Sequence, residues 1–568
     1  MRNNCFARTA QRSWLALLVG VCQVAPALAA APPAPPPPNA GTILQQAQPT
    51  PPPAPASDNS GLSIEQASPG SLPPSVPFQV SRIEITGNTR IPTATLHALV
   101  AGGEGQRITL PELAALAARI TDYYHKQGYP LARAIVPAQT MRDGVVHIEV
   151  IEARYGKISA NNQSRVRGGL LDATLDDLKS GTVVSQAQLD RSLLLLSDIP
   201  GLLVNATVKP GVEVGTSDLQ IEARSAAPII GNVTVDNSGD RYTGRARVGA
   251  NVDFLEPLHQ GDVLGLSALS SGSGMNYGRL SYDALLNGEG TRLGAGYSAL
   301  HYRLGGGLSD LDAHGTAQDA NLFLRQPLVR GRSLNLSAQV QYDHLRLNDD
   351  IEVGGIETRR HLDDVTASLT GDLRDGFLAG AVSTWAASGT YGRVGFDNPQ
   401  AEAADALAAD TQGRFSKWNL SLARLQGLDA NDALYLELGG QWTSGNLDPS
   451  QQLVLGGPTS VRAYDVSAIA GDTGWQLTTE LRHTYPQRWH GQWQAIAFVD
   501  DAHLTLNKTV FAPGPNTASL NGAGVGLNWA GPEQWTASVA VAAPFGSRPE
   551  LLGSTSSVRA WGQISKGF

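Results

Sequence analysis

The stretch "SLNLSAQVQYDHL", residues 333–345, alternates between polar and apolar side chains with a period of two. One face of this stretch carries only apolar residues, namely Leu334, Leu336, Ala338, Val340 and Tyr342. The other face carries serine, asparagine and glutamine. Successive side chains of a β-strand point to opposite faces, so this pattern predicts a strand that separates an apolar environment from a polar one.

Segments of this kind recur throughout residues 228–568. "ALYLELGGQW" (433–442) and "WTASVAVA" (535–542) show similar patterning, less strictly. When the region is divided at its turn signals, it gives about 16 such segments, as expected for a transmembrane antiparallel β-barrel with loops between its strands. The sequence therefore predicts a barrel of about 16 strands here.

A soluble β-sandwich would also alternate, but two features favour a barrel in a membrane. Nine of the ten tryptophans lie from Trp385 onward, often near predicted strand ends, where aromatic girdles meet the membrane interface. The chain also ends with "SVRAWGQISKGF" (557–568). A last strand that finishes on Phe568 resembles the sorting signal of bacterial outer-membrane barrels.

Residues 1–30 have the features of a secretory signal peptide. Arginines precede the apolar segment "WLALLVGVCQVA" (14–25), and "ALA" (27–29) supplies the small residues of a cleavage site. The apolar segment is too short to span a membrane as a helix, which needs about 20 residues. Both cysteines of the chain, Cys5 and Cys22, lie within this signal. We therefore expect an exported mature protein without disulfides.

The composition excludes several classes of function. Charged residues make up 16% of the 568 residues and the net charge is -9, without a basic patch, so we expect no nucleic-acid partner. The sequence contains no HExxH or GxSxG motif, no cysteine–histidine site and no GxxxxGK[ST] loop. We therefore expect no enzyme, no cofactor and no bound metal.

Residues 31–77 predict an extended linker, because residues 32–77 hold 15 of the 34 prolines. Between the proline runs lies "NAGTILQQAQ" (39–48), which contains the bulky apolar pair Ile43 and Leu44. Asn39 can cap a short helix at this place. From the residues alone, this segment is either such a helix or a chance helical turn in a linker.

Two α+β modules follow the linker. Residues 78–152 read as strand, helix, helix, strand, strand, and the segment "LPELAALAARITDYYHKQGY" (110–129) carries one apolar stripe at helical spacing, formed by Leu113, Leu116, Ala117, Ile120 and Tyr124. Residues 153–227 repeat this order, with Leu189, Leu193 and Leu196 on one face of the second helix. The repeated order predicts an internal duplication.

The segment "GGPTSVRAYD" (456–465) interrupts the strand pattern late in the predicted barrel. Two glycines and a proline predict a loop, and this loop carries a compact cluster around Arg462. Two β-α-α-β-β modules, a barrel of about 16 strands and this "SVRAYD" together resemble the two-partner secretion transporters of the haemolysin secretion/activation family (ShlB/FhaC/HecB-type, or TpsB). The resemblance covers nearly the whole mature chain.

The resemblance implies a role for each segment. The modules 78–152 and 153–227 are expected to be two POTRA (polypeptide-transport-associated) domains in the periplasm. The segment near 40–48, with Ile43 and Leu44, is expected to be a helix that plugs the barrel lumen. The loop near 456–474 is expected to fold back into the lumen.

The resemblance also implies a pairing inside the barrel. The family's loop motif is Val-Arg-Gly-Tyr/Phe, which here reads Val461, Arg462, Ala463 and Tyr464. The third position departs from glycine, which makes a backbone with φ > 0 less comfortable there. The family's partner motif, Phe-x-Gly/Asp, is matched by Phe498 and Asp500 in "AIAFVDDAHL" (495–504). We expect Arg462 to meet Asp500 on the inner wall, while Asp501 faces the other side.

The implied function is export of one large partner protein, such as an adhesin or a haemolysin, from the periplasm to the cell surface. The partner's N-terminal secretion domain is expected to dock on the POTRA domains, plausibly by adding a strand to a sheet edge. Other expected partners are outer-membrane lipid, the barrel-assembly machinery and periplasmic chaperones. An outer-membrane assembly factor is the alternative, although such insertases usually carry more periplasmic modules. A diffusion porin needs no such modules.

Overall fold

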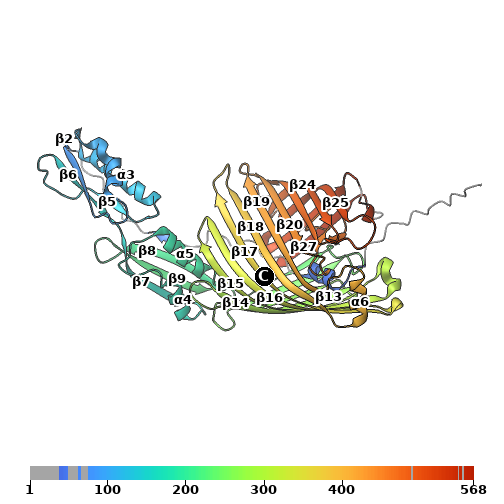
Figure 1. Cartoon of the computed structure of the whole chain (residues 1–568). Coiled ribbons are helices and arrows are strands. Elements are labelled where there is room, and N and C mark those ends of the chain that lie inside the picture. The colour runs from blue at the N-terminus through green and yellow to red at the C-terminus, as the bar shows by residue number, and fades with distance from the viewer. Residues whose placement is uncertain (1–36, 49–61, 65–74, 488–489, 548, 553–555) are drawn as a thin grey trace, which may run out of the picture.

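The computed structural model describes residues 37–48, 62–64, 75–487, 490–547, 549–552 and 556–568. The predicted signal peptide, residues 1–30, lies outside the described residues. Most of the described chain forms a closed antiparallel β-barrel of 16 strands, as predicted (Figure 1). The strands are β10 (Ile229–Asp236), β11 (Arg247–Leu255), β12 (Val263–Ser270), β13 (Met275–Leu285), β14 (Arg292–Arg303), β15 (Ala313–Arg330), β16 (Leu334–Ile351), β17 (Ile356–Asp375), β18 (Ala381–Phe396), β19 (Gly413–Gly427), β20 (Asp432–Thr443), β23 (Thr473–Thr484), β24 (Gln492–Thr505), β25 (Thr517–Ala530), β26 (Trp535–Pro544) and β27 (Arg559–Gly567).

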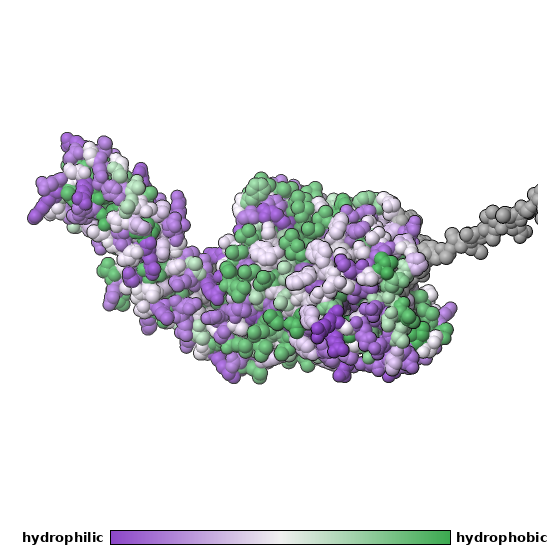
Figure 2. Space-filling view, in the orientation of Figure 1, coloured by the Kyte–Doolittle hydropathy of each residue, from purple (hydrophilic) through white to green (hydrophobic). Residues whose placement is uncertain are grey.

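The wall of the barrel shows the alternation expected from residues 333–345. On β16, the side chains of Val340 and Tyr342 point outward and are 54% and 44% exposed, whereas Asn335 is buried on the inner side. Figure 2 shows hydrophobic side chains over much of the outer wall. An apolar exterior and a polar interior are what a barrel in a lipid bilayer requires.

The barrel closes where β27 meets β10. These strands pair in register from Asn232 with Gly567 to Asp236 with Gln563. The terminal residue Phe568 extends this pairing, since its backbone N–H donates to Gly231 O at 3.0 Å and its carbonyl accepts from Gly231 N at 3.1 Å. Closure leaves no unpaired strand edge in the membrane.

Residues 78–151 form the first α/β unit. Its strands and helices are β2 (Phe78–Gln79), β3 (Arg82–Thr86), α2 (Thr93–Val100), β4 (Arg107–Ile108), α3 (Leu110–Lys126), β5 (Arg133–Ile135) and β6 (Val145–Ile151). The main sheet has the order β3-β6-β5. Helix α3 begins with a capping box between Thr109 and Glu112 and buries Leu113, Ala117, Ile120 and Tyr124, the apolar stripe of the sequence.

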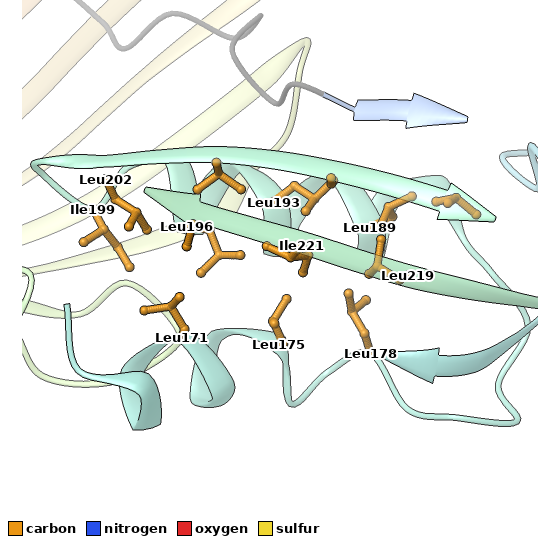
Figure 3. Close-up of a cluster of buried hydrophobic side chains, with 14 of the residues drawn as sticks. Leu171, Leu175, Leu178, Leu189, Leu193, Leu196, Ile199, Leu202, Leu219 and Ile221 are labelled. Carbon is orange, nitrogen blue, oxygen red and sulfur yellow. The ribbon is translucent and has the colours of Figure 1, made fainter. Parts of the chain in front are cut away.

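Residues 154–225 form the second α/β unit. Its elements are β7 (Arg154–Gln163), α4 (Gly168–Leu175), α5 (Gln186–Ser197), β8 (Leu202–Pro210) and β9 (Thr216–Ser225). The leucines of α4 and α5 pack against Leu219 and Ile221 of the sheet (Figure 3). Among the residues that the structure describes, no helix is long and apolar enough to cross a membrane.

The prediction of a linker throughout residues 31–77 is wrong in one place. Residues Leu62–Ile64 form a strand, β1, which pairs in parallel with β8 and becomes the edge of the second unit's sheet. The unpaired N–H and C=O groups of β8 provide a template for such pairing. Three residues are too short for a periodic signal, so the proline-rich surroundings dominated the sequence interpretation.

The second unit is held against one end of the barrel by ion pairs to the turn that joins β15 and β16. Asp198, just after α5, accepts two hydrogen bonds from the guanidinium of Arg330, both at 2.7 Å. Asp190 of α5 lies 2.8 Å from Arg332. Figure 1 shows both α/β units beyond this end of the barrel. The opposite end carries α6 (Pro399–Ala406).

Candidate functional site

The chain between β20 and β23 folds into the barrel. It forms a short hairpin of β21 (Leu453–Leu455) and β22 (Ile469–Gly471), and residues 456–468 make up the tip. The predicted loop near 456–474 is therefore one part of a longer loop, 444–472, since Thr473 already begins β23. At Gly456, φ is +104°, and an added Cβ would lie 2.3 Å from the carbonyl of Asp465, so the turn requires glycine there.

Arg462 lies at the centre of the loop tip and is buried. Its backbone N–H and its Nε both donate to Asp500 Oδ2, at 3.0 and 2.9 Å, and its Nη2 donates to Asp500 Oδ1 at 2.6 Å. The structure thus brings together the two residues that the motifs paired. Because the guanidinium and the carboxylate meet through two parallel hydrogen bonds, the pairing fixes the orientation of the Arg462 side chain as well as its distance from Asp500.

A second carboxylate, which the sequence analysis missed, completes this site. Arg462 Nη1 donates to Glu480 on β23, and Glu480 also accepts from Arg482. The guanidinium carbon of Arg462 lies 3.4 Å from the centre of the Phe498 ring, a cation–π contact. Asp500 and Phe498 face inward from β24, and Val499 between them points outward and is 46% exposed. Period two would also place Glu480 on the inner face of β23.

Apolar contacts surround the ion pair. Val461, Ala463 and Tyr464 are buried against the inner wall together with Phe498 and residues of β24 and β25. Ala463 does not have a positive φ, so the backbone strain that a positive φ would cause at a non-glycine residue does not arise here. Its methyl group faces Gly522 on β25, where an added Cβ would lie 2.5 Å from the Cβ of Ala463. A glycine on the wall therefore makes room for alanine in the loop.

Asp465 links the loop to the closing strands of the barrel. It forms ion pairs with Arg559 of β27 and, at 2.8 Å, with Arg245, which lies just before β11. Nearby, Trp561 Nε1 donates to Arg462 O at 2.7 Å.

A short helix, α1 (Ala40–Ala47), lies inside the barrel beside this loop (Figure 1). Asn39 caps it, and its side chain accepts from the backbone N–H groups of Gly41 and Thr42. Ile43 and Leu44 are buried among inward-facing side chains, which include Tyr302, Leu347 and Phe415.

Polar contacts tie α1 to both the wall and the loop. The backbone N–H of Ala40 donates to Asp349 Oδ1 at 2.7 Å. The Nε2 of Gln45 donates to the carbonyl of Ser450 at 2.6 Å, and the Nε2 of Gln46 donates to Ser467 Oγ at 2.7 Å. The helix has no charged side chain, so it is held by hydrogen bonds and apolar packing alone.

The remaining lumen is polar. A cavity of about 1040 Å³ lies beside α1 and the loop and is lined by residues that include Asp319, Asp343, Asp364 and Lys417. Within the described ranges, no group of three or more His, Cys, Asp or Glu side chains is placed to hold a metal ion. The arrangement positions a loop and a helix inside a wet channel.

Comparison with known proteins agrees with this geometry. The family "Haemolysin secretion/activation protein ShlB/FhaC/HecB" matches residues 215–529, and the ShlB-type POTRA domain matches residues 78–153. The heme/hemopexin transporter protein HuxB of Haemophilus influenzae (strain 86-028NP) is 25% identical over 478 residues, which cover 82% of this chain and 84% of HuxB. The outer membrane transporter CdiB of Escherichia coli O6:K15:H31 (strain 536 / UPEC) is 27% identical over 417 residues, 71% of this chain and 68% of CdiB.

A solved structure shows the same fold. CdiB from Escherichia coli superimposes with a TM-score of 0.68 at 22% identity, covering 89% of this chain and 92% of that chain. The family match spans more than half of the sequence and includes both the loop with Arg462 and the wall residue Asp500. The chain therefore belongs to the haemolysin secretion/activation family of ShlB, FhaC and HecB.

Proposed function

We propose that this outer-membrane protein exports one large partner protein from the periplasm to the cell surface by two-partner secretion. The observation that carries the proposal is a closed barrel whose lumen contains a short, uncharged helix and a loop pinned by one arginine. A permanently open pore wide enough for a polypeptide would leak, whereas α1 packs inside the lumen and is held there by non-covalent contacts. The cargo is an exoprotein such as an adhesin or a haemolysin.

The two α/β units receive the cargo. Residues 78–152 and 153–227 act as two POTRA domains, and the cargo's N-terminal secretion domain adds a strand to one of their sheet edges. No nucleotide is available outside the inner membrane, so folding of the cargo at the surface biases the direction of transport. We assign the delivery of the unfolded cargo to periplasmic chaperones, and the insertion of this barrel, ended by Phe568, to the barrel-assembly machinery.

Inside the barrel, we assign two roles. Residues Ile43 and Leu44 anchor α1 as the plug of the resting channel. Val461, Arg462, Ala463 and Tyr464 form the loop tip that Phe498 and Asp500 hold on the inner wall. The loop contacts α1 directly through Gln45 and Gln46, which supports a coupling between the position of the loop and the retention of the plug.

A secretion assay tests this function. The gene for a large exoprotein adjacent to that of this chain is expressed with and without the chain, and the exoprotein is measured in the medium and in the periplasm. We expect secretion only when the chain is present. Normal secretion without the chain would contradict the proposal.

A further inference from the structure

Four aromatic side chains mark the outer boundary of the lipid-facing wall on β16, β18, β19 and β20. All four point outward and are exposed, from 44% to 63%: Tyr342, Tyr391, Trp418 and Trp442. Aromatic side chains of membrane barrels gather at the level of the lipid headgroups. The α/β units lie at the opposite end of the barrel, so these aromatic residues mark the headgroup level of the outer leaflet.

Three arginines lie on the same outer face, farther from the periplasm than the aromatic residues. We call Arg346 of β16, Arg393 of β18 and Arg414 of β19 the basic patch; the sequence analysis found none, because these arginines are far apart along the chain. Each is exposed, and each is flanked in its strand by buried, inward-facing residues such as Leu347, Val394 and Phe415. Because side chains alternate along a strand, the three guanidinium groups point away from the lumen.

The basic patch contains two arginines directly opposite each other, and one carboxylate, Asp363 of β17, lies opposite Arg393 on its other side. Arg393 and Arg414 are direct cross-strand partners, an arrangement that is destabilising for like charges. Among the described residues, neither arginine forms an ion pair, and Arg346 bonds only to His344, at 3.2 Å.

The nearest outward-facing carboxylates are already engaged by other side chains. Asp363 pairs with His344 at 2.7 Å, Asp397 pairs with His361 at 2.8 Å, and Glu357 pairs with Arg359 at 2.9 Å. The guanidinium groups of Arg393 and Arg414 thus keep donors for anions in their surroundings, and the surroundings at this level are lipid headgroups.

We propose that the basic patch binds the phosphate groups of the phosphorylated glycolipid, lipid A, that forms the outer leaflet. Arginine suits this ligand, because its planar guanidinium donates two parallel hydrogen bonds to a phosphate. The exposed rings of Tyr391 and Trp418 lie on the same strands, two and four residues nearer the membrane centre, where the acyl chains begin. The positive charge of the arginines and their depth in the membrane thus match one lipid A molecule. Its phosphates would lie at the arginines, and its acyl chains would lie along the rings of Tyr391 and Trp418.

Binding of purified lipids to the full-length protein in detergent, measured by native mass spectrometry, tests the proposal. The probes are bis-phosphorylated lipid A, dephosphorylated lipid A and phosphatidylglycerol. The test variant is R393Q/R414Q, with R414Q alone as a milder form. The matched control is R303Q, because Arg303 also points outward near the same end but is paired with Asp312 at 2.7 Å.

We expect R393Q/R414Q to weaken the binding of bis-phosphorylated lipid A at least about tenfold, the loss of one or more charge-assisted hydrogen bonds. R414Q should have a smaller effect, and R303Q should bind like the wild type. Equal binding by the wild type and both test variants would overturn the proposal. Equal wild-type affinity for dephosphorylated lipid A, or for phosphatidylglycerol, would also overturn it.

Discussion

The role that we propose for the loop depends on the contact between Arg462 and Asp500. Arg462→Ala or Asp500→Ala leaves a buried charge without its main partner, a loss of about 3–5 kcal/mol in local stability. We expect each variant to reduce secretion of the partner protein strongly, as measured in the culture medium. Asp501→Ala is the control, because Asp501 lies on the other side of the same strand. Full secretion by both single variants would contradict the assigned role.

Exchanging the two charges tests the pair in a different way. In the double variant Arg462→Asp/Asp500→Arg the pair is restored, but the new carboxylate at position 462 lies near Glu480, which accepts from Arg462 in the wild type. Like charges in a buried site repel each other. We therefore expect only partial rescue of secretion, and Glu480→Gln should improve it. No difference between the exchanged protein and the Arg462→Ala variant would count against a direct pairing.

Ala463 and Gly522 provide a test of packing. Gly522→Ala places two methyl carbons about 2.5 Å apart, so the loop tip has to move away from the wall. We expect this variant to reduce secretion and to expose the loop to protease. Ala463→Gly should restore both properties in the double variant, since it removes the clashing methyl group. A double variant no better than Gly522→Ala alone would show that the effect arises elsewhere.

At the scale of single elements, α1 is the segment whose removal should change the channel. Deletion of residues 40–47 removes the buried contacts of Ile43 and Leu44, and no other described segment fills their place. We expect a higher single-channel conductance in planar bilayers. Deletion of residues 49–53, which lie outside the described part, is the control for shortening the linker. Unchanged conductance after deletion of residues 40–47 would show that α1 does not plug the channel.

In the first α/β unit, Glu152 holds the turn before α2. Its carboxylate accepts from the backbone N–H groups of Thr89 and Arg90, both at 2.7 Å, and from the Tyr124 hydroxyl. Burial raises the pKa of Glu152, but these hydrogen bonds outweigh burial, and the net pKa lies below its usual range. A lowered pKa in the folded state means that the stabilisation is present at neutral pH and is lost as the pH falls through that pKa.

Hydrogen exchange of the full-length protein measures this dependence. Amides of residues 88–91 should exchange faster, relative to intrinsic rates, at pH 4 than at pH 7 in the wild type. Glu152→Gln should show the faster exchange at both values, because its amide has one neutral acceptor oxygen where the carboxylate has two charged ones. Equal protection in the variant and the wild type at pH 7 would contradict this account.

At the scale of the whole molecule, Asp465 connects the inner loop to the line where β10 and β27 close the barrel. Its partners, Arg559 and Arg245, come from the last strand and from the chain before β11. We expect Asp465→Asn to lower the temperature at which the barrel unfolds, as shown by its heat-dependent gel mobility. Asp501→Asn, on the outer side of β24, should leave that temperature unchanged. If both variants lowered the unfolding temperature equally, the loss of one negative charge would explain the change, and the ion pairs of Asp465 would not.

The sequence predicted features that repeat or that match a motif. Alternation over 333–345 identified the wall of the barrel, and two motifs identified Arg462 and Asp500. The contacts of Glu480 and Asp465 were not predicted, because their partners depend on how distant strands are placed around the barrel. Asp465 and Arg559 are 94 residues apart, and no local pattern encodes that distance. Strand β1 escaped because three residues carry no periodicity.

The pairing of β1 with β8 restricts how far α1 can travel. Residues 48–61 join them, and in an extended polyproline conformation of about 3.1 Å per residue they reach about 43 Å. An incoming polypeptide that paired with β8 in place of β1 would displace β1 and lengthen the available chain up to residue 74. Binding of the transported protein to this sheet would then allow α1 to move farther out of the lumen. Recognition of the transported protein and opening of the channel would therefore be coupled.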